Sequence, residues 1–296
     1  MTLADRPARL GFIGLGVMGE PMCRNLAARS GAHVSAMDRD PGPLERLRAH
    51  GVQAADGIAG AARGADAVFL SLPSGAVVRE LAEAPGGLLD STGPGQVVVD
   101  LGTSPVDLTR DLARRFAERG AVFVDAPVAR TRAAAEAGTL SVMVGADAPV
   151  FERIRPWLAC FASDITLCGP SGCGQIVKLL NNMVLFETVM ALSEAKAIGE
   201  RAGVDPALLF ETLSKGSADS FALRNHGMKA MLPGDFPERA FSVSYAAKDL
   251  SYALALAADT GVDARGAQLV RALFEQAEEA GIADRYFPVI STLAGR

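Results

Sequence analysis

Lysine usage marks a candidate acid–base residue. The chain has only five lysines, all from position 178 onward, so arginine supplies most of its positive charge. Lys178 lies in an apolar stretch that is typical of a helix, and Asn182 follows one turn later on the same face. A buried ammonium shifts its pKa readily and can exchange a proton, whereas a guanidinium cannot. Lys178 is therefore a candidate general acid and base, although most lysines simply lie on a solvated face.

A second group of residues is typical of a dinucleotide site. Gly14-Leu15-Gly16-Val17-Met18-Gly19 follows an expected strand at 10–13 and opens an expected helix at 20–29. In this GxGxxG context the glycines let the backbone approach a pyrophosphate at a helix N-terminus. Asp38 ends the next expected strand, 19 residues after Gly19, where an acid bonds the adenine ribose 2′-hydroxyl. The alternative is a glycine-rich turn followed by an ordinary acidic loop residue.

Asp38 also bears on the choice of coenzyme. Its carboxylate repels a 2′-phosphate, which favours NAD(H) over NADP(H). The neighbouring Arg39 acts in the opposite direction, because an arginine there can pair with that phosphate or stack on adenine.

The elements that must position these residues follow a βαβ order in the first half of the chain. Short apolar strands are expected at 10–13, 33–37, 67–72, 97–101, 122–124, 140–144 and 164–167. Most are separated by alanine- and arginine-rich stretches with helical spacing, such as 105–119. Apolar strands that alternate with helices predict an α/β domain with a mostly parallel sheet covered on both faces.

The second half reads as helical. A turn-rich segment at 169–172 precedes a helix of roughly 30 residues, from about 174 to 202, that is apolar on nearly every side. Further helices are expected at 206–213, 242–260, 264–280 and 283–293. We therefore predict a nucleotide-binding domain over residues 1–170 and an all-α domain over residues 171–296. The apolar excess on its long helix indicates that this second domain also serves oligomerisation.

Composition excludes several classes of protein. The 296 residues are 49% hydrophobic and 21% charged, with a formal net charge of −5. This is enough apolar material for a sizeable core, and a mildly acidic chain argues against nucleic acid or an anionic membrane as the partner. Glu187 interrupts the most apolar stretch, so no membrane span is expected.

Cysteines and histidines give no metal-ligand spacing. They are Cys23, Cys160, Cys168, Cys173, His33, His50 and His226. No CxxC pair occurs, so we expect no metal site. The N-terminal region offers no convincing signal-peptide cleavage site, so the cysteines are expected to be free thiols in a reducing cytoplasm.

These motifs, taken together, resemble the β-hydroxyacid dehydrogenase family over nearly the whole chain. They are the segments 11–22, 125–128 (Asp-Ala-Pro-Val), 137–140, 172–174 with 178–182, and 248–250 (Lys-Asp-Leu), in the family's order. The resemblance implies a Rossmann domain followed by a helical domain joined through a long helix, and homodimers or homotetramers. It also implies NAD(P)-dependent interconversion of a β-hydroxyacid and its semialdehyde.

The resemblance assigns roles to individual residues. Lys178 matches the catalytic lysine, Asn182 the asparagine that helps hold the substrate, and Lys248 a second lysine at the cofactor–substrate cleft. Leu72-Pro73 and Thr103 match loops that line the nicotinamide, although the turn around Thr103 is one residue shorter than usual. The catalytic lysine disfavours the imine reductases, which share the fold.

One loop departs from the family pattern. Ala129-Arg130-Thr131 stands where most members have a Ser-Gly-Gly that cradles the substrate carboxylate. Arginine is a multi-donor fork suited to an oxyanion, and the sulfolactaldehyde reductases of this family resemble the chain here. We expect first a reductase of 3-sulfolactaldehyde whose sulfonate is held by Arg130 and Thr131. The alternative to this contact is that Arg130 points into solvent.

Two other functions stay open at this point. The first is an enzyme of the 3-hydroxyisobutyrate dehydrogenase or tartronate semialdehyde reductase type, which acts on a carboxylate with the same site chemistry. The second is a non-catalytic NAD-binding module. The presence of Lys178, Asn182 and Lys248 disfavours the module, because a protein that only binds the dinucleotide has no need of them.

Overall fold

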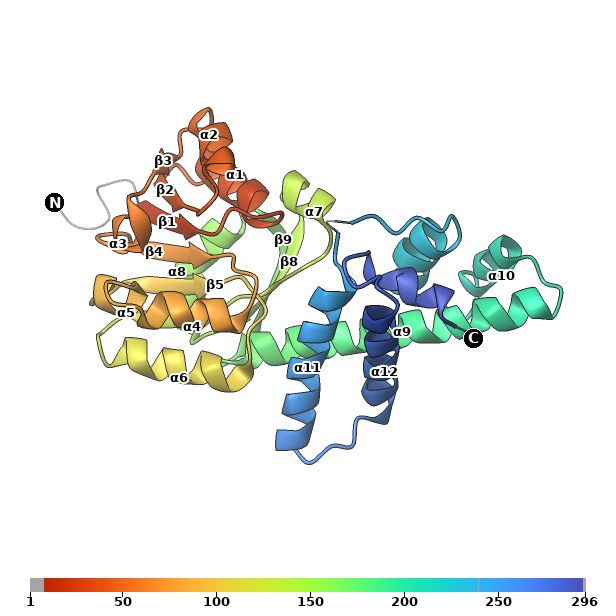
Figure 1. The fold of residues 1–296 in the computed structure, drawn as a ribbon. Coiled ribbons are helices and arrows are strands. Elements are labelled where there is room, and N and C mark those ends of the chain that lie inside the picture. The colour runs from red at the N-terminus through yellow and green to blue at the C-terminus, as the bar shows by residue number, and fades with distance from the viewer. Residues whose placement is uncertain (1–7, 239, 295–296) are drawn as a thin grey trace. The chain divides into compact units, whose positions relative to one another are not determined.

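The first part of the chain is built on a nine-stranded sheet within the described residues (Figure 1). The computed structural model describes residues 8–238 and 240–294. The strands are β1 Arg9–Ile13, β2 His33–Met37, β3 Gln53–Ala54, β4 Ala67–Leu70, β5 Val97–Asp100, β6 Val122–Asp125, β7 Val128–Ala129, β8 Leu140–Gly145 and β9 Ala162–Gly169. Their order is β3-β2-β1-β4-β5-β6-β8-β7, with β9 paired to β8.

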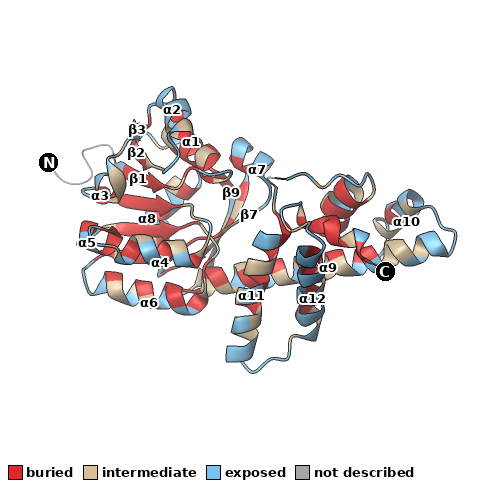
Figure 2. Ribbon diagram, in the orientation of Figure 1, coloured by how far each residue is buried: buried red, intermediate tan, exposed pale blue. Residues whose placement is uncertain are grey.

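Strands β1 to β6 run parallel, whereas β8 is antiparallel to β6 and β7. Two apolar cores lie on opposite faces of this sheet. One face is covered by α1 Gly19–Arg29, α2 Pro41–Arg48, α7 Arg132–Ala137 and α8 Ala148–Leu158. The other is covered by α3 Gly57–Ala62, α4 Gly75–Glu83, α5 Leu88–Ser91 and α6 Val106–Ala117. Figure 2 shows the central strands buried between these layers, and the predicted Rossmann-type α/β domain is confirmed.

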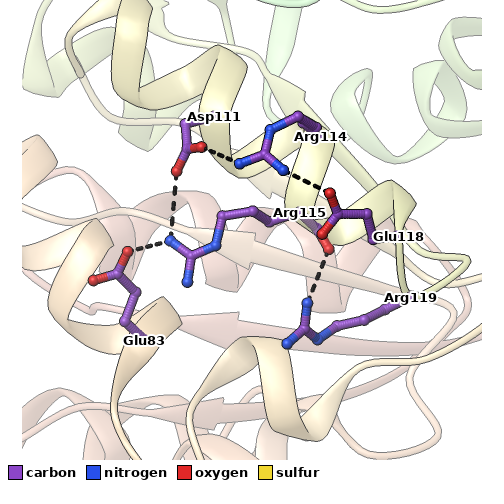
Figure 3. Close-up of polar contacts among 6 residues, drawn as sticks. All are labelled: Glu83, Asp111, Arg114, Arg115, Glu118 and Arg119. Atoms are coloured by element: carbon purple, nitrogen blue, oxygen red, sulfur yellow. Dashed lines mark hydrogen bonds and ion pairs between the residues drawn. The ribbon is translucent and has the colours of Figure 1, made fainter.

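Helix α6 and the two residues that follow it carry a cluster of charged side chains. Its members are Asp111, Arg114, Arg115, Glu118 and Arg119, joined by Glu83 of α4 (Figure 3). Arg114 contacts Asp111 at 2.7 Å and Glu118 at 2.5 Å. Solvent screens such exposed pairs, so they keep this surface polar and add little to stability.

The second part of the chain is helical. It comprises most of α9 Cys173–Arg201, followed by α10 Pro206–Leu213, the π-helix η2 Leu223–Met231, α11 Val243–Asp259, α12 Arg265–Glu279 and the 3₁₀ helix η3 Phe287–Thr292. The rings of Phe186, Phe241, Phe274 and Phe287 contact one another at its centre. The predicted all-α second domain is confirmed. The chain divides into units 1–178 and 179–296, eight residues beyond the boundary at 170 that the sequence predicts.

The sequence prediction was wrong at two places in this unit. The helix expected over 283–293 is a 3₁₀ helix over Phe287–Thr292, because residues before it are extended: the N–H of Tyr286 donates to Pro237 and that of Phe287 to Phe241. The expectation missed η2, whose turns are widened so that the N–H of Leu232 donates to the carbonyl of Gly227, five residues back.

Helix α9 is the one described helix long and apolar enough to cross a membrane. A central helix of a soluble domain meets the same criterion, and Phe186, Val189 and Leu192 of α9 are buried in the core of the second unit. This feature is therefore weak evidence for a membrane span.

Candidate active site

Three glycines shape the turn between β1 and α1. A Cβ on Gly14, whose φ is +93°, would lie 2.3 Å from the carbonyl oxygen of Ser71. A Cβ on Gly19 would lie 2.0 Å from the carbonyl oxygen of Gly14. Both positions therefore exclude any side chain. A Cβ on Gly16 would meet no protein atom within 4 Å, so glycine there leaves open space in front of the turn.

The N-terminus of α1 faces this open turn. Leu15 is buried and anchors the turn, whereas Val17 is 49% exposed. Met18 is the N-cap residue and makes no side-chain capping bond. The N–H of Glu20 donates to the carbonyl of Gly16 at 3.1 Å and Pro21 has no N–H, so the positive end of the helix dipole, rather than a set of open amides, favours an anion here. These residues fit the pyrophosphate of NAD(P).

Asp38 follows β2 directly and is tied to the glycine turn. Its Oδ2 accepts from the backbone N–H of Leu15 at 2.5 Å, and its Oδ1 accepts from that of Asp40 at 2.8 Å. A carboxylate has about four acceptor sites, so the predicted bond to a ribose hydroxyl is still open to it. The neighbouring Arg39 is exposed.

The loops after β4 and β5 adjoin the glycine turn. Leu72 Cδ2 would lie 3.1 Å from a Cβ on Gly14, and the carbonyl oxygen of Leu72 would lie 3.1 Å from a Cβ on Gly102. Pro73 and Thr103 lie in these same two loops, Pro73 exposed and Thr103 partly buried. The structure thus brings the predicted coenzyme residues of β1, β2, β4 and β5 to one edge of the sheet.

A buried carboxylate fixes the start of α9 on the sheet. Asp125 ends β6 and is 0% exposed. Its Oδ1 accepts from the N–H of Gly172 at 2.8 Å, and its Oδ2 accepts from the N–H of Gln175 at 2.9 Å. Burial raises the pKa of the Asp125 carboxyl, and these backbone amides act in the opposite direction. Because its first-turn amides are held, α9 begins at a defined place on β6.

Two more glycines permit this close approach. A Cβ on Gly145 would lie 2.4 Å from Asp125 Oδ1, and a Cβ on Gly174 would lie 2.4 Å from the carbonyl oxygen of Met143. Lys178 follows one turn after Gly174 on α9 and is partly buried. The position of Lys178 in the first unit is therefore set by the Asp125 anchor.

Asn182 and Lys248 meet at one aspartate in the second unit. Asn182 is 2% exposed, and its Nδ2 donates to Asp249 Oδ2 at 2.7 Å. Its Oδ1 accepts from Asn181 Nδ2 at 3.1 Å. Lys248 Nζ lies 3.0 Å from Asp249 Oδ1, in an ion pair whose angles fall short of a hydrogen bond. Asp249 is 3% exposed, so a buried negative charge orients both predicted substrate residues.

Two tyrosines bracket the ammonium of Lys248. Its Nζ lies 5.4 Å from the ring centroid of Tyr245 and 5.6 Å from that of Tyr252. Rings at this distance attract a cation through their quadrupole. Together with Asp249 they hold the long lysine side chain in one direction.

Arg130 is engaged within the first unit. Its Nη1 donates to the carbonyl oxygen of Thr139 at 2.6 Å and to Ser163 Oγ at 3.0 Å, and its Nη2 pairs with Asp164 at 2.8 Å. Thr131 is the N-cap of α7, and its Oγ1 accepts from the N–H of Ala134 at 3.4 Å. The guanidinium is thus turned toward the starts of β8 and β9, and its predicted contact with a substrate anion stays a prediction.

Four residues that position predicted site residues within their own unit have no role assigned from the sequence, namely Asp100, Asp125 and Gln175 in the first unit and Asp249 in the second. Each is buried and polar. The sequence does contain a signal for two of them. Asp100 follows three apolar residues and Asp125 follows four, so each lies where an apolar strand is expected to end and a carboxylate can reach the loops. Among the described residues no group of three or more His, Cys, Asp or Glu side chains is placed to hold a metal ion.

Comparison with known proteins agrees with this arrangement. Residues 9–169 match the family described as the NAD binding domain of 6-phosphogluconate dehydrogenase. Residues 172–290 match the family described as NAD-binding of NADP-dependent 3-hydroxyisobutyrate dehydrogenase. The fold and these matches define an NAD(P)-dependent oxidoreductase that acts on hydroxyl groups.

Individual relatives narrow the class. The 2-(hydroxymethyl)glutarate dehydrogenase of Eubacterium barkeri is 34% identical over 94% of this chain and 92% of its own length. The 2-hydroxy-3-oxopropionate reductase of Escherichia coli K12 is 36% identical over 83% of both chains. The structure of Mycobacterium tuberculosis 3-hydroxyisobutyrate dehydrogenase with L-serine has a TM-score of 0.88 and 30% identity, and covers 97% of this chain and 99% of that one. The chain therefore belongs to the β-hydroxyacid dehydrogenase family.

Proposed function

We propose that this enzyme interconverts a small β-hydroxyacid and its semialdehyde, with NAD(H) as coenzyme and Lys178 as general acid and base. One observation carries the proposal. The helix that bears Lys178 is anchored by Asp125 to the sheet edge that also carries the glycine turn, Asp38 and the β5 loop.

The chemistry of this proposal follows from charge. Bound NAD(H) supplies or accepts the hydride. In the reducing direction the Lys178 ammonium donates a proton to the carbonyl oxygen and stabilises the negative charge that develops there. In the oxidising direction the neutral Lys178 amine removes the hydroxyl proton. Asn182, oriented by Asp249, holds the substrate as donor or acceptor.

The preference for NAD(H) is supported by Asp38. Its carboxylate is fixed by Leu15 and Asp40, so it cannot turn away from a 2′-phosphate without breaking these bonds. One related family is described as NADP-dependent, and the exposed Arg39 favours that coenzyme. A ratio of kcat/KM for NADH over NADPH well above one would support the proposal, and a ratio below one would contradict it.

The anionic group of the substrate has two candidates, a carboxylate and a sulfonate. The sequence alone favours the sulfonate, whereas the contacts of Arg130 favour the carboxylate. A carboxylate comes first, because the named relatives act on 2-(hydroxymethyl)glutarate and 2-hydroxy-3-oxopropionate and because Arg130 is already paired with Asp164. A sulfonate, as in 3-sulfolactaldehyde, comes second. Arg130 and Thr131 in place of glycines support it, since a guanidinium suits a fully ionised oxyanion.

We further propose a homodimer or homotetramer in the cytoplasm. Val184, Ile198 and Leu208 are 57%, 68% and 58% exposed, and such large apolar side chains favour cover by a second copy of the chain. The four cysteines are free thiols, as a reducing compartment requires.

Lys178→Ala tests the central claim. A general acid contributes about 10²–10⁴-fold, so kcat is expected to fall by that factor while NADH still binds. Lys196→Ala is the matched control, because Lys196 is another lysine of α9 and pairs with Glu200. If Lys178→Ala keeps kcat within about tenfold of the parent, Lys178 is not the general acid.

A further inference from the structure

One polar side chain joins the first turn of α9 to the loop after β5. Gln175 is 0% exposed. Its Nε2 donates to the carbonyl oxygen of Gly102 at 2.9 Å, and its Oε1 accepts from the backbone N–H of Ser104 at 3.1 Å. Gln175 therefore directs both ends of its amide at one loop, residues 101–105.

The two bonds flank Thr103. The carbonyl of Gly102 belongs to the peptide group before Thr103, and the N–H of Ser104 belongs to the one after it. Asp100 holds the same loop from the strand, since its Oδ1 accepts from the N–H of Gly102 at 2.9 Å and its Oδ2 accepts from Ser104 Oγ at 2.7 Å. The backbone on both sides of Thr103 is thus fixed by two buried side chains.

Gln175 also shares a helix surface with Lys178. The two residues are three positions apart on α9, so their Cβ atoms are neighbours. Asp125 fixes the backbone N–H of Gln175 itself at 2.9 Å. A shift of the 101–105 loop against this turn of α9 must therefore break a bond to the Gln175 amide.

We propose that Gln175 is a positioning residue, which sets the separation between the 101–105 loop and the turn of α9 that carries Lys178. The inference rests on the proposed function, in which this loop borders the coenzyme ring and Lys178 serves the carbonyl oxygen. Hydride and proton go to adjacent atoms of one carbonyl group, so the loop and the helix must keep a fixed distance. A misplacement of about 1 Å costs on the order of 10²-fold in rate.

Gln175→Met is the first test, with Gln96→Met as the matched control. Gln96 clamps backbone in the same manner, but before β5: its Nε2 donates to the carbonyls of Ala62 and Ala65, and its Oε1 accepts from Gly93. Both substitutions are expected to lower the melting temperature. Only Gln175→Met is expected to lower kcat about 10²-fold and to weaken NADH binding, with Gln96→Met within about threefold of the parent.

Gln175→Glu is the second test, and it separates positioning from a merely structural role. The carboxylate can accept from Ser104 but repels the carbonyl of Gly102, whereas the protonated carboxyl can donate to it. Burial raises the pKa of such a carboxyl. The ratio of kcat for Gln175→Glu to that of the parent enzyme should therefore rise as pH is lowered from about 9 to about 6.

The outcomes are distinct. Equal kcat and NADH affinity for Gln175→Met and Gln96→Met, or a pH-independent ratio near one for Gln175→Glu, would overturn the inference. If Gln175→Met does not fold, the pH series of Gln175→Glu decides. Failure of the proposed function shows instead as parent enzyme without NADH-dependent turnover, and NADH titration of the two methionine variants then still tests the positioning role.

Discussion

Replacing Arg130 by glycine and, separately, by alanine separates backbone strain from side-chain contacts. Arg130 is the one non-glycine residue with a positive φ, +88°, among the residues described. This conformation costs about 1–2 kcal/mol for a residue with a Cβ. The contacts that offset it are the bond to Thr139 at 2.6 Å, worth about 1 kcal/mol, and exposed contacts with Ser163 at 3.0 Å and Asp164 at 2.8 Å that solvent screens.

Arg130→Ala loses these contacts and keeps the strain, so it should unfold about 1 kcal/mol more easily than the parent. Arg130→Gly also loses the contacts but relieves the backbone strain. The greater freedom of glycine in the unfolded chain offsets about 0.5–1 kcal/mol of that gain. The glycine variant should therefore be the more stable of the two by about 1 kcal/mol, or about 2–4 °C in melting temperature. Equal midpoints in urea and thermal unfolding would refute the strain argument.

The same two variants test the substrate anion. If Arg130 releases Asp164 to hold a sulfonate, both substitutions should lower kcat/KM for 3-sulfolactaldehyde about 10–100-fold more than that for 2-hydroxy-3-oxopropionate, since a bond to a charged group is worth about 1.5–3 kcal/mol. Equal changes for the two substrates would reject Arg130 as a sulfonate ligand and leave the carboxylate.

Three further predictions follow from other parts of the chain. Asp249→Asn removes the charge that orients Asn182, so KM for the hydroxyacid should rise about tenfold in steady-state kinetics, and an unchanged KM would reject that role. Burial lowers the pKa of His226 to about 4 from its ordinary 6.5, so the unfolded chain takes up a proton first as pH falls. The contribution of the neutral His226 to the free energy of unfolding should therefore be fully present above pH 6.5 and decrease by about 3 kcal/mol toward pH 4. In urea unfolding, the His226→Gln variant should lose less stability over this pH range than the parent, by about that amount. Val184→Glu should shift light-scattering mass toward a smaller species, whereas an unchanged mass would place the subunit contact elsewhere.

Elements with a strong local signal were predictable from the sequence. The GxGxxG turn lies between β1 and α1 as expected, and α10 has the expected bounds Pro206–Leu213, because Asp205 caps it and Pro206 begins it. The expected 242–260 and 264–280 helices are α11 and α12 within one residue at each end. Local patterns suffice where capping and periodicity agree.

Features that depend on distant partners were not predictable. The bonds of Asp125 to Gly172, just before α9, and to Gln175 in α9 span 47 and 50 residues, and that of Asn182 to Asp249 spans 67. A single sequence contains no information on such pairs. The positive φ of Arg130 was hidden for the same reason, because an arginine gives no local sign of a conformation that glycine usually adopts.

Three aspartates at strand ends give the site a common construction. Asp38 follows β2, Asp100 ends β5 and Asp125 ends β6, and each accepts backbone N–H groups of the loop or helix beside it. At this edge the backbone hydrogen bonds between strands end, so the N–H groups of the loops need other acceptors. A fixed carboxylate supplies two acceptor oxygens without bending the sheet. Each loop is then ordered by the protein itself. Binding of coenzyme and substrate would not have to supply that ordering, which lowers the entropic cost of binding. An apolar run that ends in aspartate is therefore a sequence signal for an anchored loop. This signal identifies Asp100 and Asp125, which the GxGxxG motif and its ribose-binding aspartate do not cover.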